Sequence, residues 1–135
     1  MDNLIIDLMK SLKRFVCKGK VSQEEIENAE KLLNLKFANE YKSYVSEFGT
    51  ASAVGIELTG ITPSPRLSVV EVTKRERELN ENFPANMYVV EDPVLEGLMI
   101  LQDESGAIYS ILPHGTPKKI FNSLYDYIKE NGEFD

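Results

Sequence analysis

Few side chains in this sequence could perform chemistry, and their spacing does not gather them into a site. His114 is the only histidine and Cys17 the only cysteine among 135 residues. A zinc site needs several His or Cys ligands, and a nucleophilic cysteine needs a basic partner beside it. Cys17 as nucleophile with His114 as its base is an alternative that the sequence leaves open, although no local pattern supports it. We interpret His114 as a loop residue and Cys17 as a small apolar side chain.

Carboxylates are the other candidates for chemistry. Adjacent acids occur at Glu24-Glu25, Glu91-Asp92 and Asp103-Glu104. Such pairs can transfer protons, but these fall in expected turns or first helical turns, where acids are usually solvated. Asp103-x-Ser105-Gly106 faintly resembles part of a calcium loop but lacks the further spaced acidic ligands. The motifs GxGxxG, Walker A, GxSxG and HExxH do not occur. The sequence therefore predicts no enzyme activity, no cofactor and no metal site.

Composition and charge indicate a globular domain that is soluble or has a basic partner. Hydrophobic residues make up 42% and charged residues 27% of the chain, which is typical of a folded domain. The net charge of −7 argues against binding to nucleic-acid phosphates. No segment resembles a signal peptide or approaches the roughly 18 apolar residues of a membrane span. We therefore expect a cytoplasmic protein with neither nucleic acid nor membrane as its partner.

The elements that must position these residues follow from apolar spacing and caps. Residues 1–20 are expected to form an amphipathic N-terminal helix from Leu4 to Val16, ended by Gly19. Its lysines would also suit a helix that binds a membrane or nucleic acid, but a solvent-exposed helix face explains them more simply. A capping box, Ser22 to Glu25, begins a second helix. Asn39 caps a third helix, whose stripe of Tyr41, Tyr44, Val45 and Phe48 should be buried and which Gly49 ends.

The second half of the chain reads mainly as strands. The expected strands are Ala53–Thr59, Met87–Glu91, Leu98–Gln102, Ala107–Leu112 and a short edge strand at Lys118–Phe121. One helix from Val69 to Glu81 interrupts them, and another, around Leu124–Ile128, closes the chain. Because tight turns join consecutive strands, the strands must be antiparallel. We predict one α+β domain over residues 1–135, with an antiparallel sheet of about four to six strands and helices packed on one face.

Short segments from Val21 onward also follow a familiar order. They are Ile26–Leu33, Leu35–Val45, Phe48-Gly49, Ile56–Gly60, Ser68–Thr73, Tyr88–Asp92, Leu98–Ile111 and Ser123–Ile128. In this order the chain resembles the SUKH superfamily, which joins the yeast Smi/Knr regulators of cell-wall synthesis to many bacterial immunity proteins. It departs from the family pattern at Ala38, where a proline is usual, and at Thr50-Ala51, where a second glycine is common.

The resemblance implies a protein that acts by binding and not by catalysis. Bacterial members look like immunity proteins, each of which neutralises a cognate toxin domain, often a nuclease, in the cell that produces it. The expected partner is therefore a basic toxin, with a nuclease as the expected activity, and the acidity of this chain suits that partner. The alternative is a Smi/Knr-type regulatory or scaffold module that binds another cellular protein. We expect a monomer or a weak dimer.

Six acids are the expected partner-binding residues, because none has an obvious basic neighbour in the sequence. They are Glu57, Glu91, Asp92, Glu96, Asp103 and Glu104. Glu57 alternates with apolar residues and should point away from the apolar face of its strand, while the other five flank turns. An unpaired acidic sheet face with its loop ends would suit a basic toxin. The alternative is that these acids only keep the protein soluble.

Overall fold

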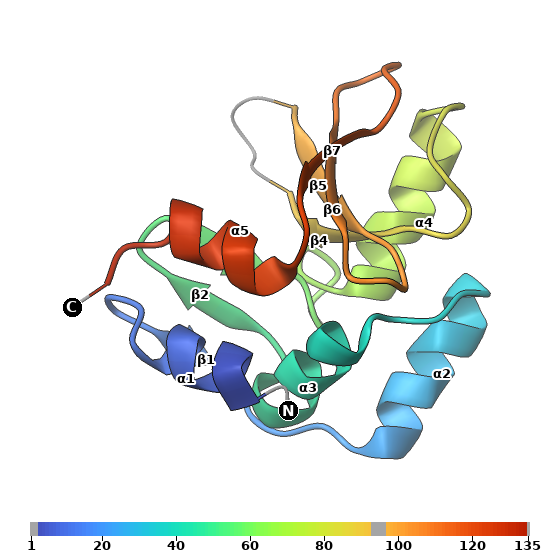
Figure 1. Cartoon of the computed structure of the whole chain (residues 1–135). Coiled ribbons are helices and arrows are strands. Elements are labelled where there is room, and N and C mark those ends of the chain that lie inside the picture. Colours follow the sequence, from blue (N-terminus) through green and yellow to red (C-terminus); the bar gives the residue numbers. More distant parts are fainter. Residues whose placement is uncertain (1–2, 93–96, 135) are drawn as a thin grey trace.

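A computed structural model of the chain describes residues 3–92 and 97–134 (Figure 1). Its helices are α1 (Asn3–Lys10), α2 (Gln23–Leu33), α3 (Asn39–Phe48), α4 (Val69–Leu79) and α5 (Leu124–Asn131). Its strands are β1 (Val16–Cys17), β2 (Ala51–Ala53), β3 (Ile56–Leu58), β4 (Tyr88–Glu91), β5 (Met99–Gln102), β6 (Ile108–Ile111) and β7 (Lys118–Phe121).

All the strands join one antiparallel sheet in chain order, β1 to β7. This confirms the α+β class and the antiparallel pairing. Within the described residues the sheet has seven strands, one more than the upper end of the expected range. The additional strands are short, and they arise where the sequence suggested a helix end and a single longer strand.

The N-terminal helix is shorter than the predicted one. It ends at Lys10, and Val16–Cys17 forms β1, which pairs with β2. Between them Arg14 adopts a left-handed conformation with φ of 58°, so the helix cannot continue. Phe15 then packs its ring edge-on against Phe48, with the ring centroids 4.8 Å apart. From apolar spacing alone, Phe15 and Val16 could equally belong to a further turn of the helix.

The predicted strand Ala53–Thr59 is in fact a hairpin. Val54 and Gly55 form the turn between β2 and β3, and Gly55 has a φ of 83°, a conformation that glycine adopts freely. Gly55 therefore reverses the chain, whereas the sequence suggested a bulge or close packing there. The later strands lie close to their expected positions.

Most helix starts follow the predicted chemistry. Ser22 and Glu25 form the complete capping box, in which each side chain accepts a hydrogen bond from the other residue's backbone N–H. Ser68 and Ser123 cap α4 and α5 in the same position. The third helix differs, because Ala38 is its N-cap residue and Asn39 is its first helical residue. No side chain caps α3 directly.

The core lies on both faces of the sheet. The larger cluster contains Tyr41, Tyr44 and Phe48 of α3, all buried as predicted, together with Tyr88 and Val90 of β4. Val89, which lies between them on β4, belongs to a second cluster, which consists of Val72, Met87, Val89, Met99, Leu101 and Ile111. Because side chains alternate across a strand, this second cluster covers the opposite face. The expectation of helices on one face therefore fails for α4, which supplies Val72.

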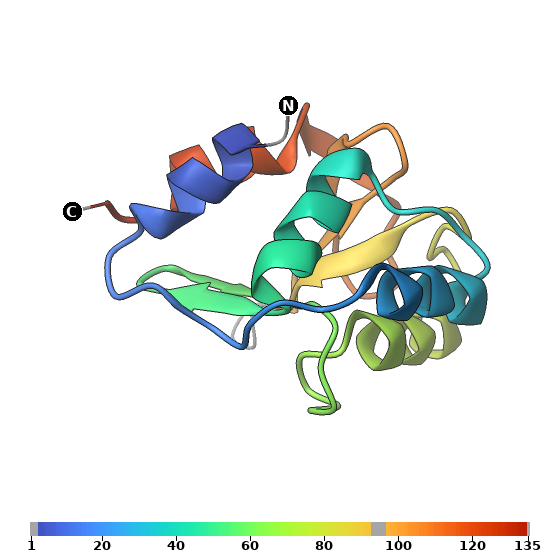
Figure 2. The same cartoon turned by 90° about the horizontal axis from the view of Figure 1, so that it is seen from below.

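The helices also pack in pairs. Figure 2 shows α1 beside α5, near the two ends of the chain, and α2 beside α4. On the sheet side of α4, the Thr73 hydroxyl accepts a hydrogen bond from the backbone N–H of Val89 over 3.0 Å. This bond ties α4 to β4. None of the described helices has the length and apolar content to cross a bilayer.

Candidate functional site

The structure divides the expected partner-binding acids between the two ends of β4. Glu91 ends β4 and pairs with Leu58, so Glu57 and Asp92 lie close to it. The other end of β4, Tyr88, pairs with Gln102, which leads into the turn with Asp103 and Glu104. The two groups are roughly 10 Å apart along the strand. Glu96 lies outside the described residues. The five acids that the structure describes therefore do not form one continuous patch.

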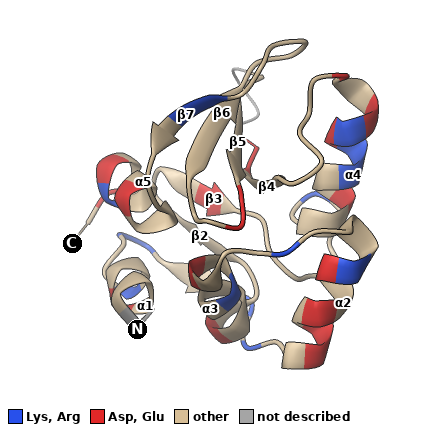
Figure 3. Cartoon of the chain, turned by 45° about the vertical axis from the view of Figure 1, so that its right-hand side comes forward, with Lys and Arg blue, Asp and Glu red and all other residues tan. Residues whose placement is uncertain are grey.

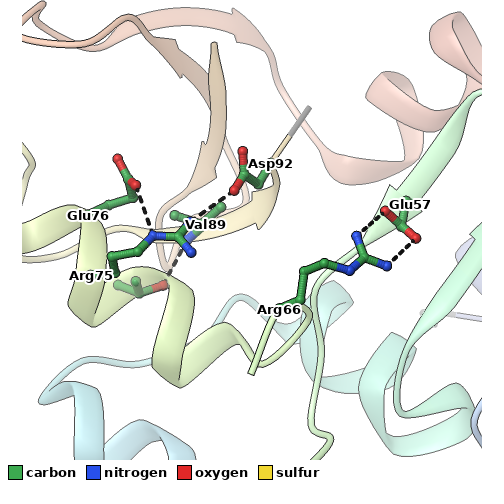
Figure 4. A network of polar contacts seen from close by, with 7 residues as sticks. Glu57, Arg66, Arg75, Glu76, Val89 and Asp92 are labelled. Carbon is green, nitrogen blue, oxygen red and sulfur yellow. Dashed lines mark hydrogen bonds and ion pairs between the residues drawn. The ribbon is translucent and has the colours of Figure 1, made fainter. Parts of the chain in front are cut away.

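Glu57 has a basic partner that the sequence did not reveal. Both of its carboxylate oxygens accept hydrogen bonds from the Arg66 guanidinium, over 2.8 and 2.9 Å (Figure 4). These bonds hold the pKa of Glu57 below its usual value. The pair is partly exposed, so it contributes little to the stability of the fold. Its two hydrogen bonds nevertheless define its geometry. Arg66 presents the carboxylate in one fixed orientation.

Asp92 is held in a similar way by a second arginine. Arg75 of α4 donates to Asp92 over 2.9 Å and lies 3.4 Å from the Glu76 carboxylate (Figure 4). One cation therefore serves two acids, which leaves a negative charge at this edge. Arg66 and Arg75 reach their partners from a loop and a helix that are distant in sequence. The premise that Glu57 and Asp92 lack basic neighbours is therefore wrong.

Glu91 belongs to the interior, against the expectation of a surface acid. Its side chain is buried, with 7% of the residue exposed. One carboxylate oxygen accepts a hydrogen bond from the Tyr127 hydroxyl of α5, and the other accepts from the backbone N–H of Glu57 over 2.8 Å. Burial raises the pKa of this carboxyl. Glu91 therefore connects α5, β3 and β4 and is not available for docking.

At the opposite end of β4, Asp103 organises the β5–β6 turn. Its carboxylate accepts hydrogen bonds from the Ser105 hydroxyl, the Ala107 backbone and the Tyr109 hydroxyl. This explains the partial calcium-loop pattern as an ordinary turn. Glu104 is exposed, and the described part of the structure gives it no polar partner. Of the acids that the structure describes, Glu104 is thus the one that is free at a loop tip.

The structure does not bring the candidate nucleophile and base together. Cys17 is exposed on β1, at one end of the strand order. His114 lies in the loop after β6, where its Nδ1 is 3.5 Å from Glu81. Five strand positions separate them, on the order of 20 Å. Within residues 3–92 and 97–134, no group of three or more His, Cys, Asp or Glu side chains could hold a metal ion.

The buried carboxyl of Glu91 predicts a pH dependence of stability. Its pKa is raised above 4.5 in the folded protein, so the folded state binds the proton more tightly than the unfolded chain. Between 4.5 and that raised pKa, the contribution of Glu91 to the unfolding free energy falls as pH rises. Each unit of pKa shift corresponds to about 1.4 kcal/mol.

Urea unfolding from pH 4.5 to neutral pH measures this effect against Glu91→Gln, which cannot ionise. The variant should gain stability relative to the wild type as pH rises. Glu25, whose pKa is lowered by its hydrogen bonds with Ser22, contributes equally to both proteins, whereas the charge of Glu57 is among the causes that raise the pKa of Glu91. A stability difference that stays constant across this range would contradict the prediction.

Comparisons with known proteins agree with the fold. A family model described as SUKH_5, SMI1-KNR4 cell-wall, matches residues 1–134. The chain is also similar to a solved structure described as a crystal structure of a protein from Pseudomonas syringae pv. tomato. That similarity has a TM-score of 0.72 and 13% sequence identity, and it covers 96% of each chain. At such low identity it shows the fold alone. No match is found among curated proteins.

Proposed function

The chain belongs to the SUKH (SMI1-KNR4) family, and from this premise we propose that it is an immunity protein. In this proposal it binds a cognate toxin domain, a basic nuclease in the form we favour, and neutralises it by protein–protein contact. The observation that carries the proposal is the family match over residues 1–134. The net charge of −7 supports a basic partner, since opposite charge speeds association and favours the right orientation.

The surface charges support a specific docking face. Figure 3 shows acids and bases interspersed along α2 and α4, and an acidic position on β3. Glu57 and Asp92 are partly exposed, and their arginines hold them in fixed positions. Glu104 lies apart from them, on the β5–β6 turn at the opposite end of β4. We propose that Glu57, Asp92 and Glu104 contact the toxin at two separate points, whereas Asp103 positions Glu104 by shaping the β5–β6 turn.

The direct test is co-expression with a toxin domain. A toxin gene beside the gene for this protein would supply the candidate. We expect this chain to restore growth to cells that express that domain, and the two purified proteins to elute as one complex. If the chain neither protects the cells nor binds the domain, the immunity proposal fails. The alternative, a Smi/Knr-type scaffold module, would then be favoured by binding to a cellular protein other than a toxin.

Association with the toxin domain should slow as salt rises, because salt screens the attraction between opposite charges. In a variant with Glu57→Gln, Asp92→Asn and Glu104→Lys, association should be slower and its salt dependence flatter. The control, Glu24→Gln with Glu27→Gln and Glu130→Lys, changes the net charge equally on other surfaces. Stopped-flow rates over a salt series measure both. Identical rates and slopes for the two variants would remove these acids from the interface.

A further inference from the structure

An apolar groove lies at the outer edge of the second core cluster. It has a volume of about 400 Å³ and runs between the end of α4 and the strands β5 and β6. Met99 and Ile111, which belong to the core, form its floor, and Leu79 and Leu112 border it. The groove is thus continuous with the hydrophobic core.

The bordering leucines are unusually exposed for their size. Leu79 is 64% and Leu112 56% exposed, although both lie beside a floor of buried side chains. Large apolar side chains that surround a concave apolar surface are typical of interaction sites. Covering both leucines together would remove more apolar area from water than covering one isolated surface leucine.

Hydrogen bonds hold the groove open in one shape. The Asn80 side-chain amide donates to the Leu112 carbonyl, and that of Asn82 donates to the His114 carbonyl. Asn80 itself is buried, with 5% exposed. These bonds connect the chain after α4 to the loop after β6, so the two walls cannot move independently. A preformed groove loses less conformational freedom when a partner binds.

The charges at the rim select the partner. Glu76 lines the groove and shares Arg75 with Asp92, which leaves one carboxylate charge unmatched. Glu81 adds another carboxylate beside the groove, 3.5 Å from the Nδ1 of His114, which lines the groove. The next arginine, Arg77, donates to the carbonyls of Leu33 and Ala85 and so turns toward α2. The groove therefore combines an apolar floor with an acidic rim.

We propose that this groove anchors a segment of the toxin domain in which an apolar side chain is flanked by Lys or Arg. The proposal rests on the immunity function above and adds the place and chemistry of the anchor. The apolar side chain enters between Leu79 and Leu112, while the flanking cations meet Glu76 and Glu81. A second copy of this acidic chain would bring like charges to the same rim, so the complementary partner is basic.

The test compares two leucine variants in binding to the toxin domain encoded by the adjacent gene. Leu79→Ser with Leu112→Ser removes the anchor, and Leu4→Ser with Leu32→Ser removes equally exposed leucines from other helices. Substitutions at such surface positions should leave the fold intact, which urea unfolding checks. We expect the groove variant to dissociate at least about tenfold faster than the wild type, and the control within about threefold of it.

The outcomes separate the two proposals. If both variants bind the toxin as tightly as the wild type, the groove proposal is wrong and the immunity function stands. If sedimentation shows that the wild type dimerises and the groove variant does not, a second copy is the occupant and the proposal is also overturned.

A peptide probe tests the groove even if the wild type binds no toxin. We would use a peptide of about twelve residues with leucines at helical spacing and lysines elsewhere, and a matched peptide with glutamates. Amide NMR signals at Leu79 and Leu112 should shift with the lysine peptide and not with the glutamate peptide. Equal shifts with both peptides, or no shifts, would overturn the proposal that the groove binds an apolar side chain flanked by basic residues.

Discussion

Replacing Phe48 with Ala is expected to lower the free energy of unfolding by about 3–5 kcal/mol. The side chain is 96% buried, with only 4% exposed, and it ends the apolar stripe of α3. Its ring packs against Phe15, which holds the segment before β1 on the sheet. The substitution therefore leaves a cavity and also weakens the attachment of β1. Urea unfolding followed by circular dichroism measures the loss.

Such a loss is a large part of the total stability of a domain of this size, and Phe48→Ala could fail to fold. Phe48→Leu keeps most of the volume and should cost less than about 1.5 kcal/mol. Leu32→Ala provides the surface control, because half of that residue is exposed, and its midpoint should stay close to that of the wild type. If Phe48→Ala also leaves the midpoint unchanged, the α3 stripe is not a core element.

A second large effect is expected for Gly60→Ala, at about 3 kcal/mol or more. An added Cβ would overlap the carbonyl oxygen of Gly49 and lie 2.8 Å from its carbonyl carbon. That carbonyl also accepts the hydrogen bond of the Ile61 backbone N–H over 3.0 Å. Since the obstacle is backbone, no rotation of a side chain can relieve the overlap. The β3–α4 connection would have to separate from the end of α3.

Gly115→Ala is the matched control for this substitution. Its added Cβ would lie 3.1 Å from the Leu112 carbonyl oxygen, which a shift of a few tenths of an ångström relieves, so we expect a change within about 1 kcal/mol. Thermal and urea unfolding of both variants measure the difference. Equal stability of the two variants would mean that the Gly49–Gly60 approach is looser than the structure indicates.

Local patterns predicted the elements whose stabilising contacts are also local. The capping box at Ser22 and Glu25 joins residues three apart, and the α3 stripe recurs at helical spacing, so both can be recognised in the sequence. The turn at Asp103 likewise depends on bonds within six residues. In these places the expected and the observed structure agree, because a short segment contains both partners of each interaction.

The predictions that were wrong concern residues whose contacts lie far apart in the sequence. Arg66 and Arg75 neutralise acids nine and seventeen residues away, and their pairing depends on how a loop and a helix cross the sheet. Glu91 is buried because Tyr127, thirty-six positions later, places α5 against it. Charge patterns in the sequence could not show these contacts. The groove between Leu79 and Leu112 was missed for the same reason, since its walls meet only in the folded chain.

The junction of β3 and β4 is a weakly paired place in the sheet. Only Leu58 and Glu91 are in register there among the described residues, and Thr59 adds backbone and hydroxyl bonds to Val90 and Val89. The Glu91 carboxylate then accepts the Glu57 N–H, replacing a rung that the backbone does not supply. We therefore expect the strands before and after this junction to open locally as separate units. Deuterium uptake at the Glu57 amide therefore reports how often β3 and β4 separate, because that amide exchanges only when its hydrogen bond to the Glu91 side chain breaks.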